Sequence, residues 1–261
     1  MELLKATNVS KHFGGLVALK NVDFTLYQGE ILGLIGPNGA GKSTLINLLS
    51  GYFVPTRGEI EFEGRVISGM NASRISGFGI ARTFQLVRVF KRLTVIENIL
   101  AALVDRNQDG PWALVMHSFT RRRGAYNMDV HACAKAEELL AFVGLLEYRD
   151  VLAESLPYAL TKRLEIARAL ATKPKLLLLD EPSCGLNPQE LNEQIEIIKE
   201  INREGISILI IEHVMKVIMG ISHRLMVLHY GEKIAEGKPE DVYSDPLVID
   251  AYLGGEAHVT H

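Results

Sequence analysis

The sequence contains few of the features that mark secreted, membrane-spanning or disulfide-stabilised chains. Its two cysteines, Cys133 and Cys184, are too few for a disulfide framework. No apolar stretch approaches the roughly 18 residues that a membrane-spanning helix needs. The first five residues lack the layout of a signal peptide. We therefore expect a cytoplasmic protein.

The chain also has no large excess of positive or negative charge. The 261 residues carry a formal net charge of −3, which gives no electrostatic footprint for nucleic acid. The basic run 121–123 is short, and a solvated loop is favoured over contact with lipid headgroups. Cys184 is interpreted as a small packed residue rather than a redox group. A hydrophobic fraction of 48% suits an ordinary folded core and argues against disorder.

The stretch 36–44 fits the phosphate-binding loop pattern G-x-x-x-x-G-K-[ST] at every fixed position. It lies between an apolar run, 31–35, predicted as a buried strand, and a predicted helix over 43–50. The glycines permit a tight turn in which backbone N–H groups point at phosphate oxygens, and the helix N-terminus adds its positive end. A glycine-rich turn with an exposed lysine is the alternative. The predicted nucleotide-binding residues are Gly36, Pro37, Asn38, Gly39, Ala40, Gly41, Lys42, Ser43 and Thr44.

Within this loop two side chains have distinct predicted tasks. Lys42 is expected to reach the β- and γ-phosphates of ATP, and the Ser43 hydroxyl to hold Mg²⁺. ATP and Mg²⁺ are therefore the predicted cofactors.

Two carboxylates end a second predicted strand. Four consecutive leucines, 176–179, indicate a strand covered on both faces, as in a parallel sheet. Ligands of such sheets bind beyond the carboxyl ends of the strands, where Asp180 and Glu181 fall. Asp180 fits the Walker-B role of holding Mg²⁺, directly or through a water, and Glu181 that of general base toward the attacking water. The alternative is a pair of solvated charges at the end of a strand.

The remaining patterns predict an α/β fold with a parallel core sheet, an N-terminal antiparallel β part and an inserted helical part. Residues 1–65 are expected to be rich in strands, the stretch 94–171 helical, and the chain after Ala171 an alternation of strands and helices typical of βαβ units. Residues 105–129 are polar and rich in turn formers, which indicates a loop-rich insertion. Tyr230 and Gly231 are predicted to form a hairpin turn. The expected strands are 3–9, 22–26, 30–35, 59–62, 80–85, 176–180, 206–211, 225–228 and 233–236, and the expected helices after Ala171 are 188–203 and 214–220.

These residues resemble the ATP-binding subunit of ABC transporters over nearly the whole chain. The resemblance implies that Phe13 stacks on adenine, that Gln85 belongs to the glutamine loop and touches Mg²⁺ and water, and that His213 is the switch histidine. It identifies 185–188 (Gly-Leu-Asn-Pro) as the D-loop. A core position for Phe13 and a structural role for His213 are the alternatives. It implies a P-loop NTPase fold of the ABC ATPase type, in which residues 1–261 form a single ATP-binding domain with a helical subdomain over about 86–171.

The chain is similar in particular to the LivG-type branch, which serves branched-chain amino-acid importers. The motifs that carry this likeness are 13–19, 82–85, 94–98, 164–170, 185–188 and 250–254. The resemblance implies membrane permease subunits, a second ABC ATPase subunit and, indirectly, a periplasmic substrate-binding protein as partners. It also implies a peripheral position on the inner face of the cell membrane. Transport of urea, short amides or lipid-type cargo remains open, because this subunit does not touch the cargo.

One motif departs from the family pattern. Where most members have the signature Leu-Ser-Gly-Gly-Gln, this chain has Leu156-Pro157-Tyr158-Ala159-Leu160. Pro157 lacks the hydroxyl, Leu160 lacks the amide, and Ala159 has a Cβ where close approach to a phosphate favours glycine. Val214 follows the switch histidine where an aspartate is common.

The poor signature favours a heterodimer over a homodimer. In a head-to-tail dimer each site takes Walker motifs from one subunit and the signature from the other. A partner with a normal signature would then complete one good site on this chain. Two alternatives remain: a mainly ATP-binding, weakly hydrolysing partner subunit, and a soluble ABC ATPase of repair or translation. The second usually carries two cassettes or a long coiled-coil insert, which this chain lacks.

Overall fold

The computed structural model describes residues 1–85, 88–103 and 130–253. The chain forms two compact units, Met1–Gln85 with Pro174–His261, and Leu86–Lys173. Residues 105–129, predicted as a loop-rich insertion, lie outside the described residues, as do Arg121–Arg123. No helix in the described part of the chain is both long and apolar enough to cross a membrane.

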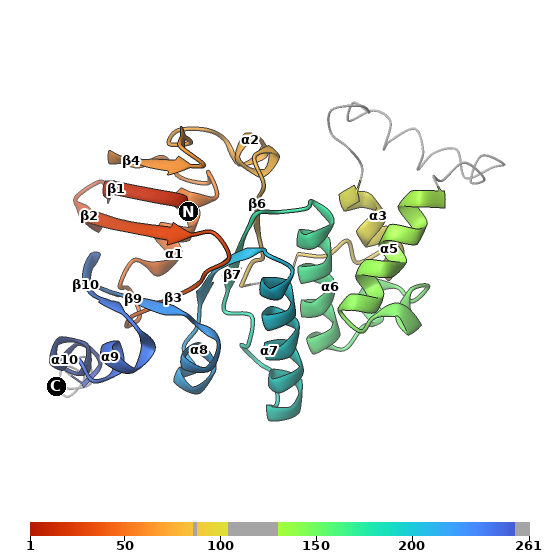
Figure 1. The fold of residues 1–261 in the computed structure, drawn as a ribbon. Helices are drawn as coiled ribbons and strands as arrows, with labels where there is room; N and C mark the ends of the chain where they lie inside the picture. Colours follow the sequence, from red (N-terminus) through yellow and green to blue (C-terminus); the bar gives the residue numbers. More distant parts are fainter. Residues whose placement is uncertain (86–87, 104–129, 254–261) are drawn as a thin grey trace. The chain divides into compact units, whose positions relative to one another are not determined.

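The first unit contains a six-stranded sheet in the order β10-β9-β3-β8-β7-β6 (Figure 1). Neighbouring strands from β9 to β6 are parallel, and β10 pairs antiparallel with β9 at one edge. The central strands are buried on both faces, which is why their sequences are continuous apolar runs. The strands are β3 (Ile31–Ile35), β6 (Ile80–Arg82), β7 (Leu176–Asp180), β8 (Ser207–Ile211), β9 (Arg224–His229) and β10 (Glu232–Gly237).

A second, antiparallel sheet is built from the N-terminal residues, which the sequence predicted to be rich in strands. Its order is β2-β1-β4-β5. The strands are β1 (Glu2–Phe13), β2 (Leu16–Tyr27), β4 (Arg57–Phe62) and β5 (Arg65–Val66). β1 and β2 are longer than the predicted 3–9 and 22–26. Their pairing is interrupted by several register shifts, so the alternation of apolar and polar residues that marks a strand is lost near the ends.

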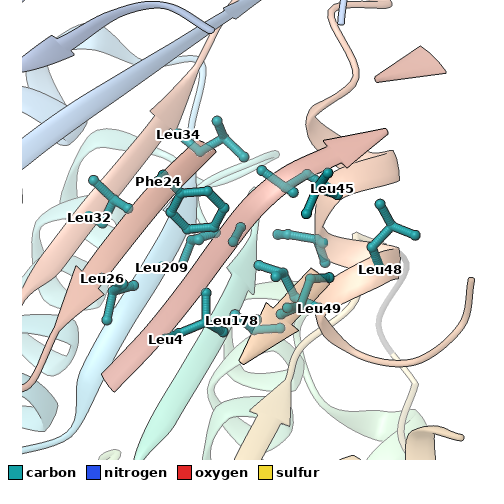
Figure 2. Packing of buried hydrophobic residues seen from close by; sticks show 14 of the residues in the cluster. Leu4, Phe24, Leu26, Leu32, Leu34, Leu45, Leu48, Leu49, Leu178 and Leu209 are labelled. Carbon is teal, nitrogen blue, oxygen red and sulfur yellow. The ribbon is translucent and has the colours of Figure 1, made fainter. Parts of the chain in front are cut away.

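The main core of this unit lies between the two sheets and includes helix α1 (Lys42–Leu49). Figure 2 shows Leu4, Phe24 and Leu26 of the antiparallel sheet facing leucines of α1 and of the central sheet. Leu45 and Leu49 on α1 are fully buried. The helix that follows the phosphate loop is therefore held on two sides by apolar contacts, so the loop is attached to a packed element.

The rest of the unit is helical. Helix α8 (Met215–Ile221) approaches the central sheet closely at Gly33, where a Cβ would lie 2.8 Å from Ile218. The hairpin turn between β9 and β10 falls at Tyr230 and Gly231, both with positive φ, as predicted. The remaining helices are α2 (Ala72–Gly77), α7 (Pro188–Arg203), α9 (Pro239–Tyr243) and α10 (Pro246–Leu253).

The second unit is helical in its described part, and its helices α3, α5 and α6 contact one another. A reciprocal capping box between Thr94 and Glu97 begins α3. Asn98 is fully buried, and its side chain satisfies backbone groups of Phe90, Leu93 and Thr94. The elements are α3 (Val95–Leu103), α5 (Val130–Phe142), α6 (Tyr158–Ala171) and two short 3-10 turns, η2 (Leu146–Tyr148) and η3 (Ala153–Ser155).

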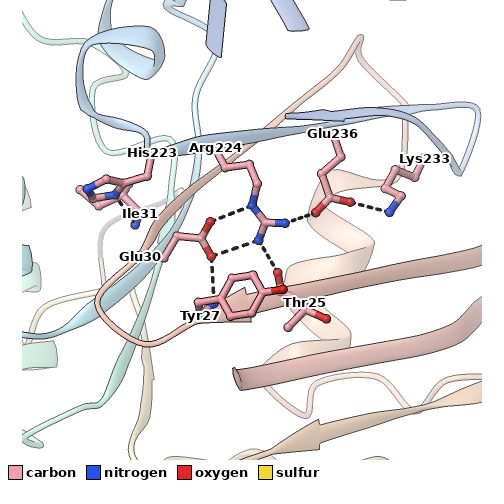
Figure 3. Close-up of polar contacts among 8 residues, drawn as sticks. All are labelled: Thr25, Tyr27, Glu30, Ile31, His223, Arg224, Lys233 and Glu236. Carbon is pink, nitrogen blue, oxygen red and sulfur yellow. Dashed lines mark hydrogen bonds and ion pairs between the residues drawn. The ribbon is translucent and has the colours of Figure 1, made fainter. Parts of the chain in front are cut away.

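A charged network fastens the two sheets of the first unit together (Figure 3). Arg224 on β9 makes two hydrogen bonds to Glu30, of 2.8 and 3.0 Å, and also binds Glu236 and the carbonyl of Thr25 on β2. The guanidinium also lies 5.3 Å from the ring centre of Tyr27. With 77% of its side chain buried (23% exposed), Arg224 has exchanged most of its water for these partners.

We expect Arg224→Met to lower the free energy of unfolding by about 3 kcal/mol, because the largely buried carboxylate of Glu30 then loses its cation, whereas Glu236 keeps its ion pair with Lys233. Urea unfolding of the whole chain measures the change. The control is Lys20→Met, which breaks the exposed ion pair between Lys20 and Glu232. This substitution should lower the free energy of unfolding by no more than about 1 kcal/mol. Equal costs for the two substitutions would contradict this role of the network.

Candidate nucleotide site

The phosphate loop connects β3 to α1 in the first unit. Gly36 has φ of +147°, and a Cβ there would lie 2.0 Å from the carbonyl oxygen of Leu228. Gly41, the N-cap of α1, has φ of +103° and leaves no room for a Cβ beside Ala18 and Leu19. Both positions therefore require glycine for space as well as for backbone conformation.

The start of α1 is open to an anion. Among the residues that the structure describes, no side chain caps the helix, so the N–H groups of its first turn have no side-chain acceptor there. Ser43 and Asn38 are exposed, and Thr44 is half-buried. Free helix N–H groups and the positive end of the helix dipole together favour a phosphate at this place.

Lys42 is 6% exposed and is held inside the loop. Its ammonium donates to the carbonyls of Gly36 at 2.6 Å and of Pro37 at 2.9 Å. Burial lowers the pKa of Lys42, while the nearby carboxylates of Glu181 and Asp180 act in the opposite direction. The carbonyls of Gly36 and Pro37 therefore hold the ammonium of Lys42 inside the loop.

The two Walker-B carboxylates lie at the carboxyl end of β7 but have different surroundings. Asp180 is 6% exposed and receives a 3.0 Å hydrogen bond from Arg82 at the end of β6. Glu181 has φ of +51°, a conformation that costs free energy for a residue with a Cβ, and its backbone N–H donates to Ile211 on β8. Backbone strain of this kind is typical of functional positions.

Three predicted catalytic side chains meet at Glu181. Gln85 Nε2 donates to Glu181 Oε2 at 3.0 Å, and His213 Nε2 lies 2.6 Å from Glu181 Oε1. The residues come from the segment after β6, the end of β7 and the end of β8, which are neighbouring parallel strands. This arrangement brings a carboxylate, an amide and an imidazole to one edge of the sheet.

Phe13 has a different neighbourhood. It lies at the end of β1, is 40% exposed, and its ring meets that of Phe53 edge-on at 5.2 Å. The ammonium of Lys11 lies 5.0 Å from the ring centre of Phe13. The exposed part of the ring is free of the core, which is the condition for stacking on a planar ligand.

Two functional candidates were not predicted from the sequence. Arg82 joins Asp180 to α1, since its guanidinium also donates to Asn47 at 2.6 Å and to Ser50 at 3.0 Å. Glu212 is 3% exposed and accepts hydrogen bonds from two backbone N–H groups beside the site. The sequence places each of these charged residues directly after apolar strand residues, at the edge where the ligand is expected, but it does not indicate their burial or their partners.

The D-loop and the signature segment begin helices. Asn187 caps α7 in a reciprocal capping box with Glu190, with Pro188 in the first turn. In the second unit, α6 begins at Tyr158 with Pro157 as an N-cap that offers no side-chain hydrogen bond. The side chain of Ala159 is buried, and that of Tyr158 is 49% exposed.

Comparison with known proteins shows the family to which the chain belongs. Residues 19–184 match the ABC transporter family, and residues 232–258 match the branched-chain amino acid ATP-binding cassette transporter family. The high-affinity branched-chain amino acid transport ATP-binding protein LivG of Escherichia coli is 43% identical over 97% of this chain and 98% of its own length. The corresponding BraF protein of Pseudomonas aeruginosa is 38% identical over the same shares.

Solved structures show the same fold. An ATP-binding cassette of an ABC transporter in its ADP conformation superposes with a TM-score of 0.84 at 33% identity, covering 97% of this chain and 99% of that one. A dimeric bacterial ABC transporter cassette has a TM-score of 0.75 at 26% identity, covering 91% and 99%. The predicted α/β fold is confirmed. The chain belongs to the ABC transporter family, as an ATP-hydrolysing cassette of its branched-chain amino-acid branch.

Proposed function

We propose that this chain binds and hydrolyses ATP at the edge formed by β3, β7 and β8, and thereby powers an importer of branched-chain or related amino acids. The observation that carries the proposal is the meeting of Gln85 and His213 on Glu181 beside the phosphate loop. The identity of 43% to a branched-chain amino acid transport protein supports the cargo class.

The loop and α1 would bind the triphosphate. Lys42 and the free N–H groups of α1 offset charge on the β- and γ-phosphates, and Phe13 offers an exposed ring to the adenine. Glu181 accepts a proton from the attacking water as the new P–O bond forms and the bond to ADP breaks. His213, hydrogen-bonded to Glu181, contacts the γ-phosphate and keeps the carboxylate oriented.

The residues present suit Mg²⁺. Among those that the structure describes, no group of three His, Cys, Asp or Glu side chains is arranged to hold a metal ion alone. The oxygens of Ser43, Asp180 and Gln85 are the hard ligands that Mg²⁺ takes together with phosphates. When bound, the ion would neutralise charge on the β- and γ-phosphates.

The signature segment favours a heterodimer. A partner with a normal signature would complete the site built on Lys42, Asp180 and Glu181, whereas this chain would offer its partner only Pro157, Ala159 and Leu160. ATP would then hold the two subunits together, and hydrolysis would release them. Gln85 and the helical unit would relay closure to a membrane permease on the inner face of the membrane, with a periplasmic protein selecting the cargo. Urea or other amides are the competing cargo.

We expect Glu181→Gln to lower ATP turnover by roughly a hundredfold or more while ATP binding persists, because a general base contributes that much and the amide keeps the shape. Turnover is measured with the assembled transporter and binding by calorimetry. The matched control is Glu63→Gln, at an exposed carboxylate paired with Lys175, which should leave turnover unchanged. Full turnover in Glu181→Gln would mean that this subunit binds ATP without hydrolysing it.

The heterodimer has its own test. The glutamate that follows the Walker-B aspartate is replaced by glutamine in each ATPase subunit separately, and turnover of the two assembled transporters is compared. We expect the substitution in this chain to remove most of the turnover and the substitution in the partner to remove little. Equal losses would refute the asymmetric arrangement.

A further inference from the structure

Glu212 is a buried carboxylate between the two loops that carry the proposed catalytic pair. It directly follows β8, and its side chain is only 3% exposed. Its Oε1 accepts the backbone N–H of Ser183 at 2.8 Å, and its Oε2 accepts the backbone N–H of His213 at 3.2 Å. Each oxygen of the carboxylate thus holds a different loop.

The two anchored amides flank the reactive side chains. Ser183 lies two residues after Glu181, and His213 is the next residue after Glu212 itself. β7 and β8 pair in register up to Asp180 and Ile211, and Glu181 N–H then donates to Ile211. The backbone pairing of β7 with β8 ends at that bond. Beyond it, the carboxylate of Glu212 joins the segment after β7 to the segment after β8 through its hydrogen bonds to Ser183 and His213.

Burial of the Glu212 carboxylate costs free energy, because the group loses its contact with water. Burying an ionised group is unfavourable unless it is paired or hydrogen-bonded. In the described part of the chain the bonds of Glu212 go to backbone N–H groups, and no ion pair forms there. The two backbone N–H groups are bound at the same time, one by each oxygen of the carboxylate, so a side chain that replaces Glu212 needs an acceptor atom at both positions. A glutamine has one, and its amide N–H would face a second donor.

The geometry points to Glu212 as a positioning residue that fixes the His213 ring against Glu181. The distance between His213 Nε2 and Glu181 Oε1 is 2.6 Å. Because the imidazole is 43% exposed, packing against other side chains does not by itself fix the orientation of the ring. The backbone N–H bond of His213 to Glu212, together with that of Ser183, sets the distance between the two loops. This inference rests on the proposed roles of Glu181 and His213.

A double-mutant cycle in the assembled transporter tests the inference. We expect Glu212→Gln to lower kcat for ATP roughly tenfold, the value for one charge-assisted hydrogen bond, with KM for ATP within about twofold of the unsubstituted chain. In a His213→Ala background, Glu212→Gln should change kcat by less than about twofold, because the group through which it acts is gone.

The control is Glu97→Gln, which alters another carboxylate that accepts a backbone N–H, at the start of α3, and should leave both constants unchanged. Circular dichroism verifies the fold of each variant. If Glu212→Gln does not fold, Glu212→Asp, which keeps the charge on a shorter side chain, is used with the same two expectations.

Three outcomes overturn the inference. Equal losses of kcat in the two backgrounds, or a change confined to KM, would show that Glu212 acts independently of His213 and would leave the proposed function standing. A His213→Ala chain with full turnover would overturn the inference and also the role of His213 in the proposed function.

Discussion

The parallel pairing of β3, β8 and β7 determines where the proposed catalytic groups lie. Leu34 and Asp180 both pair with Ile211, so the three strands end at nearly the same level. The residues that follow them are the phosphate loop, Glu181 and Glu212 with His213. A slip of one residue in this register would turn each strand over and move the groups to different faces. Because these strands are fully buried, the register is strongly specified.

The phosphate loop of the proposed site is attached to a packed helix, whereas Glu181 lies on strained backbone. Helix α1 is held between two sheets by Leu45 and Leu49, so the proposed phosphate loop is attached to a packed element. Glu181, in contrast, has a positive φ that the strand end and its hydrogen bonds must maintain. Arg82 joins these two parts, since the same guanidinium binds Asp180 and the side chains of α1. The helix after the phosphate loop and the proposed Mg²⁺ ligand Asp180 are therefore joined by one arginine.

Much of this could be predicted from local sequence. Helix α7 begins and ends at the predicted residues because Asn187, Pro188 and Glu190 are strong local signals for a helix start. The predicted strand 80–85 was too long. β6 ends at Arg82, where the pairing with β7 stops and the side chain instead reaches across to Asp180. The roles of Arg82 and Glu212 depend on partners 98 and 29 residues away, which no local pattern encodes.

We propose that this chain holds ATP at the carboxyl edge of β3 through the phosphate loop. Calorimetric titration of ATP with Mg²⁺ into the intact chain, into Lys42→Ala and into the surface control Lys20→Ala tests it most directly. We expect one ATP to bind per chain, the affinity for ATP to fall by at least about tenfold in Lys42→Ala, and the affinity of the control to be unchanged. Unchanged affinity in Lys42→Ala would contradict it.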